Sequence, residues 1–135
     1  MDGVILTPLK QISNPKGDVF HAMKCTDTGF NGFGEAYFSS INEGDIKGWK
    51  KHNAMTLNLV VICGEIEFVI YNENTEDFFE VILSHENYQR LTIFPGIWVA
   101  FRGLNDKNML LNLANLPHDP LESENIAISE IYYEW

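Results

Sequence analysis

The sequence predicts an all-β fold, either a sandwich of two sheets or a closed barrel. Short apolar or alternating runs recur along the 135 residues, and Gly, Pro, Asn and Asp separate them. Many short strands at this spacing favour a sandwich or a barrel. No stretch of a dozen residues has a convincing helical period. The length fits one domain with a single core, which we assign to residues 1–135.

The first third of the chain ends in a run that alternates as a half-buried strand does. In "GEAYFSSI", Glu35, Tyr37 and Ser39 point to one side of an extended chain, and Ala36 and Phe38 point to the other. The elements expected up to this point are a strand at 4–6, a turn at 14–18 ("NPKGD"), a strand at 19–24, a strand ending at 41 and a turn at 42–45.

Two apolar strands follow in residues 57–72, where Cys63-Gly64 splits the run and is expected to form a tight turn. Pro95-Gly96 separates two further strands within 91–104 in the same way. The remaining elements expected are a strand at 77–84, a turn or short helical piece at 85–88, a strand at 108–115, a polar loop at 118–125 and, at 127–135, either a last strand or an irregular tail.

The charge balance argues against nucleic acid as a partner. The net charge is −10 with only nine Lys plus Arg, whereas a phosphate backbone needs basic residues spread over a surface. Lys47, Lys50 and Lys51 are three of those nine and fall together beside His52 in "IKGWKKH". This concentration favours a small anionic ligand. The alternative is a solvated strand end whose charges discourage edge pairing.

Other classes of site and location receive little support. The N-terminus lacks the pattern of a signal peptide, and no apolar run reaches the roughly 18–20 residues of a membrane span, so we expect a cytoplasmic protein without a membrane partner. Cys25 and Cys63 form no disulfide or metal motif and are expected to be buried free thiols. The histidines His21, His85 and His118 stand apart, and we expect neither a metal nor another cofactor.

Several segments together resemble one family. "NPKGDVF", "GWKKHNAMTLNLVVICGEIEFVIYN", "ILSHENYQRLTIFPGIWVAF" and "HDPLESENI" are similar to successive segments of the cupin-fold dTDP-4-dehydrorhamnose 3,5-epimerases and dTDP-sugar 3,4-ketoisomerases. The resemblance covers nearly the whole chain. It implies a double-stranded β-helix, the cupin jelly roll, in a homodimer that acts on a nucleotide sugar without a metal.

The resemblance also exposes three departures at positions that handle protons. Where relatives carry the working histidine this chain has Lys50, where they carry a tyrosine it has Leu111, and a second pocket histidine falls at Val99. The next inward position is His52, about 6–7 Å along an extended strand from Lys50. The catalytic candidates are therefore His52 as base with Lys50 as the cation that stabilises an enolate, or Lys50 itself as base. The alternative for His52 is a pocket-lining histidine without a catalytic role.

Further residues are expected to bind the substrate. Lys47 and Lys16 align with family arginines, and both present point charges where relatives have a bidentate guanidinium. Glu35, Tyr37 and Arg102 complete this set, with Tyr37 either replacing the missing phenol or forming a wall of the pocket. In the loop that contains Asp119 and Glu122, one carboxylate either orients a histidine or, as we favour, is a solvated charge.

These features predict a nucleotide-sugar isomerase or epimerase. It would act on a dTDP-linked or similar 4-keto-6-deoxysugar, by proton abstraction next to the ketone, in surface polysaccharide or deoxysugar biosynthesis. The altered proton-handling positions keep two alternatives open, a nucleotide-sugar-binding cupin without catalysis and a 3,4-ketoisomerase in place of a 3,5-epimerase. A mainly structural dimer that binds no nucleotide is the third.

Overall fold

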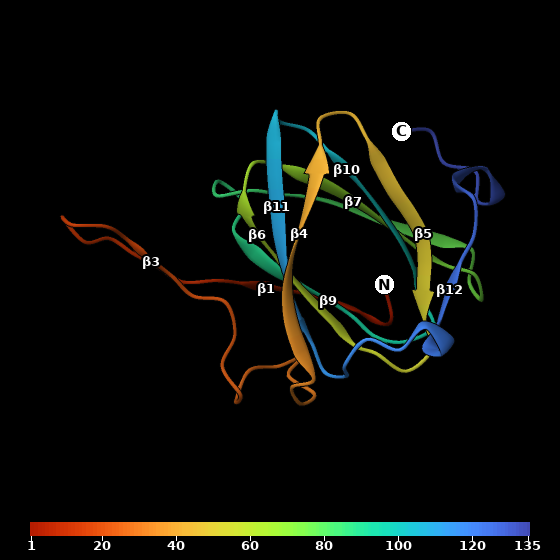
Figure 1. Cartoon of the computed structure of the whole chain (residues 1–135), viewed down its shortest axis with the longest axis horizontal. Coiled ribbons are helices and arrows are strands. Elements are labelled where there is room, and N and C mark those ends of the chain that lie inside the picture. The colour runs from red at the N-terminus through yellow and green to blue at the C-terminus, as the bar shows by residue number, and fades with distance from the viewer.

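Two five-stranded antiparallel sheets face each other in the computed structural model, which describes residues 1–135 (Figure 1). The first sheet has the order β1-β9-β6-β11-β4 and the second β12-β5-β10-β7-β8. The first consists of β1 (Val4–Pro8), β4 (Glu35–Asn42), β6 (Leu57–Cys63), β9 (Gln89–Ile93) and β11 (Lys107–Ala114). The second consists of β5 (Ile46–His52), β7 (Ile66–Asn72), β8 (Asp77–Leu83), β10 (Trp98–Gly103) and β12 (Ser123–Asn125).

From β4 to β7 each strand lies in the sheet opposite to the one before it. This is the jelly-roll arrangement that the sequence predicts. The turn at Cys63-Gly64 accordingly joins two sheets and does not close a hairpin, which corrects the pairing expected for residues 57–72. Gly64 allows this corner because its φ is +77° and a Cβ there would lie 2.0 Å from the Lys107 carbonyl oxygen.

The main core lies between the sheets, where the inward positions of the strands are apolar. Leu57, Leu59 and Val61 alternate inward along β6, and Phe68 and Ile70 do so along β7. A second, smaller cluster lies outside the second sheet. Its centre is Trp49, Val69, Trp98 and Ala100, and side chains of the C-terminal tail, which include Ile131, Tyr133 and Trp135, pack on it.

The tail and the loop before it differ from expectation. The segment 118–125, expected as a polar loop, contains the 3-10 turn η1 (Pro120–Glu122) and the strand β12, which pairs with β5 so that Ser123 lies opposite His52. Residues 127–135 form an irregular tail with one 3-10 turn, η2 (Ile128–Glu130). Neither helical turn has the length and apolar character that a membrane span requires.

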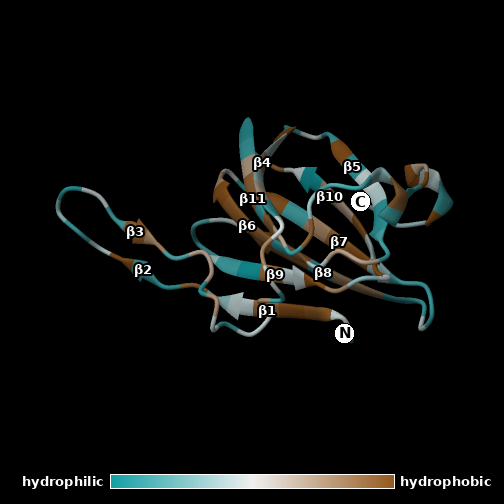
Figure 2. Ribbon diagram, turned by 60° about the horizontal axis from the view of Figure 1, so that its bottom comes forward, coloured by the Kyte–Doolittle hydropathy of each residue, from teal (hydrophilic) through white to brown (hydrophobic).

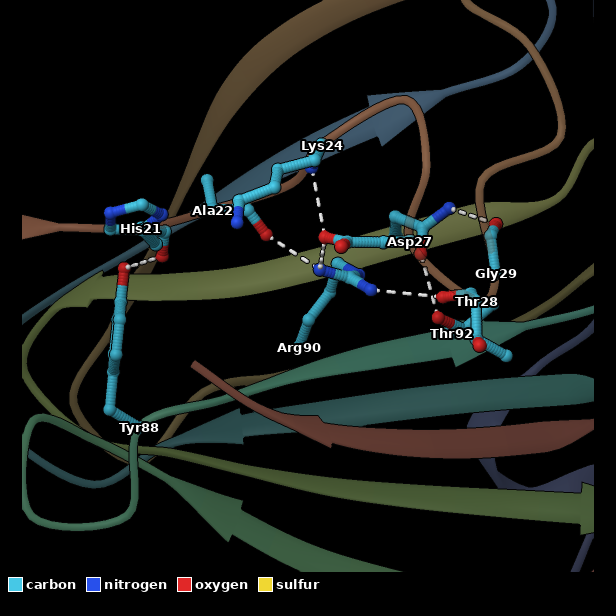
Figure 3. Close-up of polar contacts among 10 residues, drawn as sticks. His21, Ala22, Lys24, Asp27, Thr28, Gly29, Tyr88, Arg90 and Thr92 are labelled. Carbon is cyan, nitrogen blue, oxygen red and sulfur yellow. Dashed lines mark hydrogen bonds and ion pairs between the residues drawn. The ribbon is translucent and has the colours of Figure 1, made fainter. Parts of the chain in front are cut away.

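The hairpin of β2 (Gln11–Ile12) and β3 (Val19–Phe20) projects from the body as an arm (Figures 1 and 2). A strand is expected at 19–24, but only the first two of these residues form one, as β3. The chain beyond them runs along the outside of the first sheet, where buried Arg90 donates to the carbonyls of Ala22 at 2.8 Å and Thr28 at 3.0 Å (Figure 3). A side chain thus satisfies backbone groups that a strand would have paired.

Both cysteines are free, as predicted, but the structure places Cys25 and Cys63 at the surface. The expectation of burial is therefore wrong. Cys63 is the last residue of its strand, at the corner between the two sheets, and Cys25 lies in the outer loop.

Candidate active site

A cavity of about 270 Å³ opens between the two sheets, and both polar and apolar side chains line it. The strand β5 supplies one wall and the strands β4 and β11 supply the facing wall. The lining residues include Lys47, Gly48, Lys50 and His52 from β5, Tyr37 and Ser39 from β4, Leu110 and Asn112 from β11, and Val99 and Phe101 from β10.

His52 lies in this cavity with a carboxylate bound to its ring. The ring nitrogen Nδ1 contacts Glu122 Oε1, and both side chains are about nine-tenths buried, at 9% and 11% exposure. A carboxylate can only accept a hydrogen bond, so Nδ1 carries the proton in the neutral ring. The lone pair is then on Nε2, which makes that nitrogen a base.

Glu122 is itself held in place by the backbone after β5. Its second oxygen, Oε2, accepts hydrogen bonds from the amides of Ala54 at 3.0 Å and Met55 at 3.1 Å. Burial acts to raise the pKa of Glu122, but the hydrogen bonds from His52 and the two amides outweigh it and hold that pKa below its ordinary value. The carboxylate is therefore charged and fixed, and it is not the solvated loop charge that the sequence favoured.

The three lysines of β5 separate by the alternation of the strand. Lys50 lines the cavity together with His52, as the shared face predicts, and forms no ion pair. Lys51 points to the other side, where Glu73 at 2.8 Å and Glu124 at 3.3 Å bind it above the Trp98 ring. Lys47 lies at the cavity and donates to the Ser40 carbonyl at 2.5 Å. The cavity therefore holds two of the three cationic groups.

Tyr37 lines the facing wall. Its hydroxyl lies 3.0 Å from Asn112 Nδ2, and the two residues are opposite each other in the β4–β11 register. Leu111 points away from the cavity, between the two inward residues Leu110 and Asn112. Neither inward position is a phenol, so Tyr37 is the phenol of this cavity.

Three predicted ligand contacts lie outside the cavity of a single chain. Arg102 points outward, since its neighbour Phe101 points in, and pairs with Glu67 at 2.7 Å. Glu35 is at the far end of β4, beyond the cavity. Lys16 lies at the turn of the projecting arm. No three His, Cys, Asp or Glu side chains lie together in a way that could hold a metal ion.

Comparison with solved structures gives the family. A dTDP sugar isomerase from Desulfovibrio desulfuricans G20 superposes with a TM-score of 0.93 and 31% sequence identity, over 99% of this chain and 91% of that one. The chain belongs to the dTDP-sugar isomerase family. This similarity confirms the predicted family resemblance, the cupin jelly roll and the isomerase class. No family model matches the sequence, and no curated protein does.

More distant isomerases share the fold. A 3,4-ketoisomerase from Thermoanaerobacterium thermosaccharolyticum, solved with TDP-4-keto-6-deoxyglucose, has a TM-score of 0.81 at 18% identity, over 92% of this chain and 88% of that one. A 3'-monoepimerase from Streptomyces bikiniensis, solved with dTDP-quinovose, has a TM-score of 0.84 at 14% identity, over 93% and 70%. Proteins described as a 3,4-ketoisomerase and as a 3'-monoepimerase thus share this architecture.

Sequence reasoning gave the role of Glu122 only as the less favoured alternative, and it missed Asn112. Glu122 is 70 residues from His52, and only the pairing of β12 with β5 brings the segment that contains it alongside. Asn112 carried no motif at all. The one available signal was its place in "NMLLNLAN", where a polar residue occurs at an inward position of an otherwise apolar strand.

Proposed function

We propose that this member of the dTDP-sugar isomerase family acts on a dTDP-linked 4-keto-6-deoxysugar, with His52 as the base that removes a proton next to the ketone. The observation that carries the proposal is that His52, which lines the cavity between the sheets, is paired with the buried, charged Glu122. A carboxylate that fixes one ring nitrogen as donor leaves the other as a base of defined direction.

The chemistry follows from these groups. His52 Nε2 takes the proton from the carbon beside the carbonyl, and the electron pair moves to the carbonyl oxygen to give an enolate. The Glu122 carboxylate stabilises the imidazolium that forms. Lys50, on the same face of β5, supplies a positive charge for the enolate oxygen. Return of a proton to the same carbon from the other face gives an epimer. Return of the proton to the former carbonyl carbon, with transfer of the proton of the adjacent hydroxyl to the former carbonyl oxygen, moves the ketone.

Lys47 and Tyr37 remain the proposed ligand contacts from a single chain, because both line the cavity. Lys47 provides a charge for the diphosphate. Lys16 reaches a ligand only if the arm packs on a second copy, and Ile12, Val19 and Phe20 of the arm are 39%, 51% and 40% exposed. We therefore keep the homodimer as part of the proposal, to be tested by light scattering of the protein and of a Phe20→Asp variant.

The deciding experiment incubates the protein with a panel of dTDP-4-keto-6-deoxysugars in heavy water. Mass spectrometry should show deuterium uptake at a carbon next to the ketone, and His52→Gln should abolish it. Thermal stabilisation by the same compounds without any deuterium uptake would instead establish a binding protein that lacks catalysis. Neither uptake nor stabilisation with any of them would refute the assignment to this substrate class.

Cytoplasmic residence and a role in deoxysugar or surface polysaccharide biosynthesis stay predictions from the sequence. The product identified in the exchange experiment would test the predicted biosynthetic role, since it defines which sugar the enzyme can deliver.

A further inference from the structure

The carboxamide of Asn112 has only one orientation that satisfies its neighbours. Its Oδ1 accepts a hydrogen bond from the backbone amide of Asn58 at 3.2 Å, and a backbone N–H can only donate. The oxygen therefore lies on that side. The Nδ2 group then faces the Tyr37 hydroxyl at 3.0 Å.

This orientation sets the polarity of Tyr37. A carboxamide nitrogen can only donate, so the phenol oxygen must accept from Asn112. The hydroxyl hydrogen of Tyr37 then points away from Asn112. Because Tyr37 lines the cavity and is 43% exposed, its hydrogen is available to an acceptor on a bound molecule.

A buried network holds Asn58 and thereby Asn112. Asn58 Oδ1 accepts from the Thr92 hydroxyl at 2.7 Å, and Asn58 Nδ2 donates to the Gly29 carbonyl at 3.1 Å (Figure 3 shows Thr92 and Gly29). The exposure of both Asn58 and Asn112 is 1%. Buried amides with every partner fixed are rigid, so the direction of the Asn112 hydrogen bond is set by the fold and not by the ligand.

We propose that Asn112 is a positioning residue that makes Tyr37 an obligatory hydrogen-bond donor to an oxygen of the bound sugar. The donor acts from the β4–β11 wall, opposite the wall that carries Lys50 and His52, so the sugar is held between the two. This inference rests on the proposed function, and it adds a specific contact on the side of the cavity that holds neither the base nor the cation.

The test is a double-mutant cycle with Asn112→Asp and Tyr37→Phe. In Asn112→Asp one carboxylate oxygen still accepts from Asn58, while the other accepts from the Tyr37 hydroxyl and turns its hydrogen away from the cavity. Each single change should lower kcat/KM for the dTDP-4-keto sugar about tenfold, the effect of one lost hydrogen bond. The double variant should match Tyr37→Phe within about threefold.

The cycle separates orientation from charge and from folding. A charge effect of the new carboxylate would act equally with and without the Tyr37 hydroxyl, so the two losses would multiply to about a hundredfold and overturn the inference. Asn112→Leu adds no charge and should show the same non-additivity, which keeps the test valid if Asn112→Asp does not fold. Tyr88→Phe, which deletes a phenol that donates to the His21 carbonyl outside the cavity, is the matched control and should keep wild-type kinetics.

The failures of the two proposals are distinct. Normal wild-type turnover with losses that multiply, or with Tyr37→Phe unchanged, would overturn the role of Asn112 alone. A wild-type protein that neither binds nor turns over any dTDP-4-keto sugar would overturn the proposed function, and this inference with it.

Discussion

Replacing Glu122 with Gln should abolish most turnover while leaving the fold intact, because the two oxygens of Glu122 have separate partners. Oε2 accepts from the amides of Ala54 and Met55, and Oε1 binds His52. In the variant the side-chain amide oxygen stays with the two backbone donors, which only an acceptor satisfies. The side-chain NH₂ group of the introduced glutamine then faces His52 Nδ1.

That exchange of acceptor for donor selects the wrong tautomer of His52. Nδ1 must now accept, so the ring proton moves to the other nitrogen and the lone pair no longer faces the substrate. A general base contributes about 10²–10⁴ in rate, and the same carboxylate-to-amide change in the serine-protease triad costs about 10⁴. We therefore expect kcat to fall by about 10²–10⁴, which corresponds to roughly 3–5 kcal/mol of activation free energy.

The assay is deuterium uptake from heavy water under single-turnover conditions, with the melting temperature measured in parallel. Glu124→Gln is the matched control, since Glu124 lies two residues on and contacts Lys51 outside the cavity. It should retain wild-type exchange. If Glu122→Gln folds and keeps more than about a third of the wild-type rate, the pairing of Glu122 with His52 does not set the tautomer and the reasoning is refuted.

The other predictions concern the cation Lys50, the backbone at Gly48, the buried Arg90 and the loss of stability at low pH. Lys50→Met should lower kcat about 10²-fold with little change in melting temperature, since it removes the charge proposed for the enolate oxygen; unchanged kcat would exclude that role. Gly48→Ala should unfold or strongly destabilise the protein in urea titrations, because φ is +141° and the new Cβ would lie 2.5 Å from a side chain of β10. Arg90→Met should lower the free energy of unfolding by about 3 kcal/mol, whereas Arg102→Met, which removes a partly exposed ion pair, should change it by less than about 1 kcal/mol; equal losses would contradict this. The pKa of Glu122 is lowered in the folded protein, so its charged form stabilises the fold at pH values above its ordinary pKa of 4.5. This contribution is lost as pH falls through the pKa of the folded state. The free energy of unfolding of Glu122→Gln should therefore decrease less below pH 4.5 than that of the wild type.

The strands and their inward faces could be predicted from local pattern because a period of two needs no knowledge of partners. Lys50 and His52 share a face by alternation alone, and the structure places both in one cavity. Local pattern could not predict which of the two sheets each strand joins. The corner at Gly64 depends on how closely the Lys107 carbonyl approaches it, a contact between segments far apart in the chain that a local pattern does not contain.

Alternation also explains why some predicted contacts do not meet the cavity. Arg102, predicted to bind the substrate, follows an inward Phe101 and must point outward to Glu67. Lys16 was chosen by alignment, and alignment does not say whether a residue serves its own chain or a neighbour. In both cases the residue type was considered without the direction of the strand or the position of the segment that carries it.

A lysine at the position of the family histidine still leaves a histidine in the cavity as the proposed base. Moving a residue by two along β5 keeps it on the same face, so His52 reaches the same cavity as Lys50. The direction of the proposed base comes not from its own strand but from Glu122, which the pairing of β12 with β5 brings to the His52 ring. The pairing also leaves the Lys50 ammonium without a carboxylate partner, because Glu73 and Glu124 bind Lys51 on the outer face. One strand thus presents a histidine with an acidic partner and a lysine without one, which is the division of charge that the proposed enolate intermediate requires.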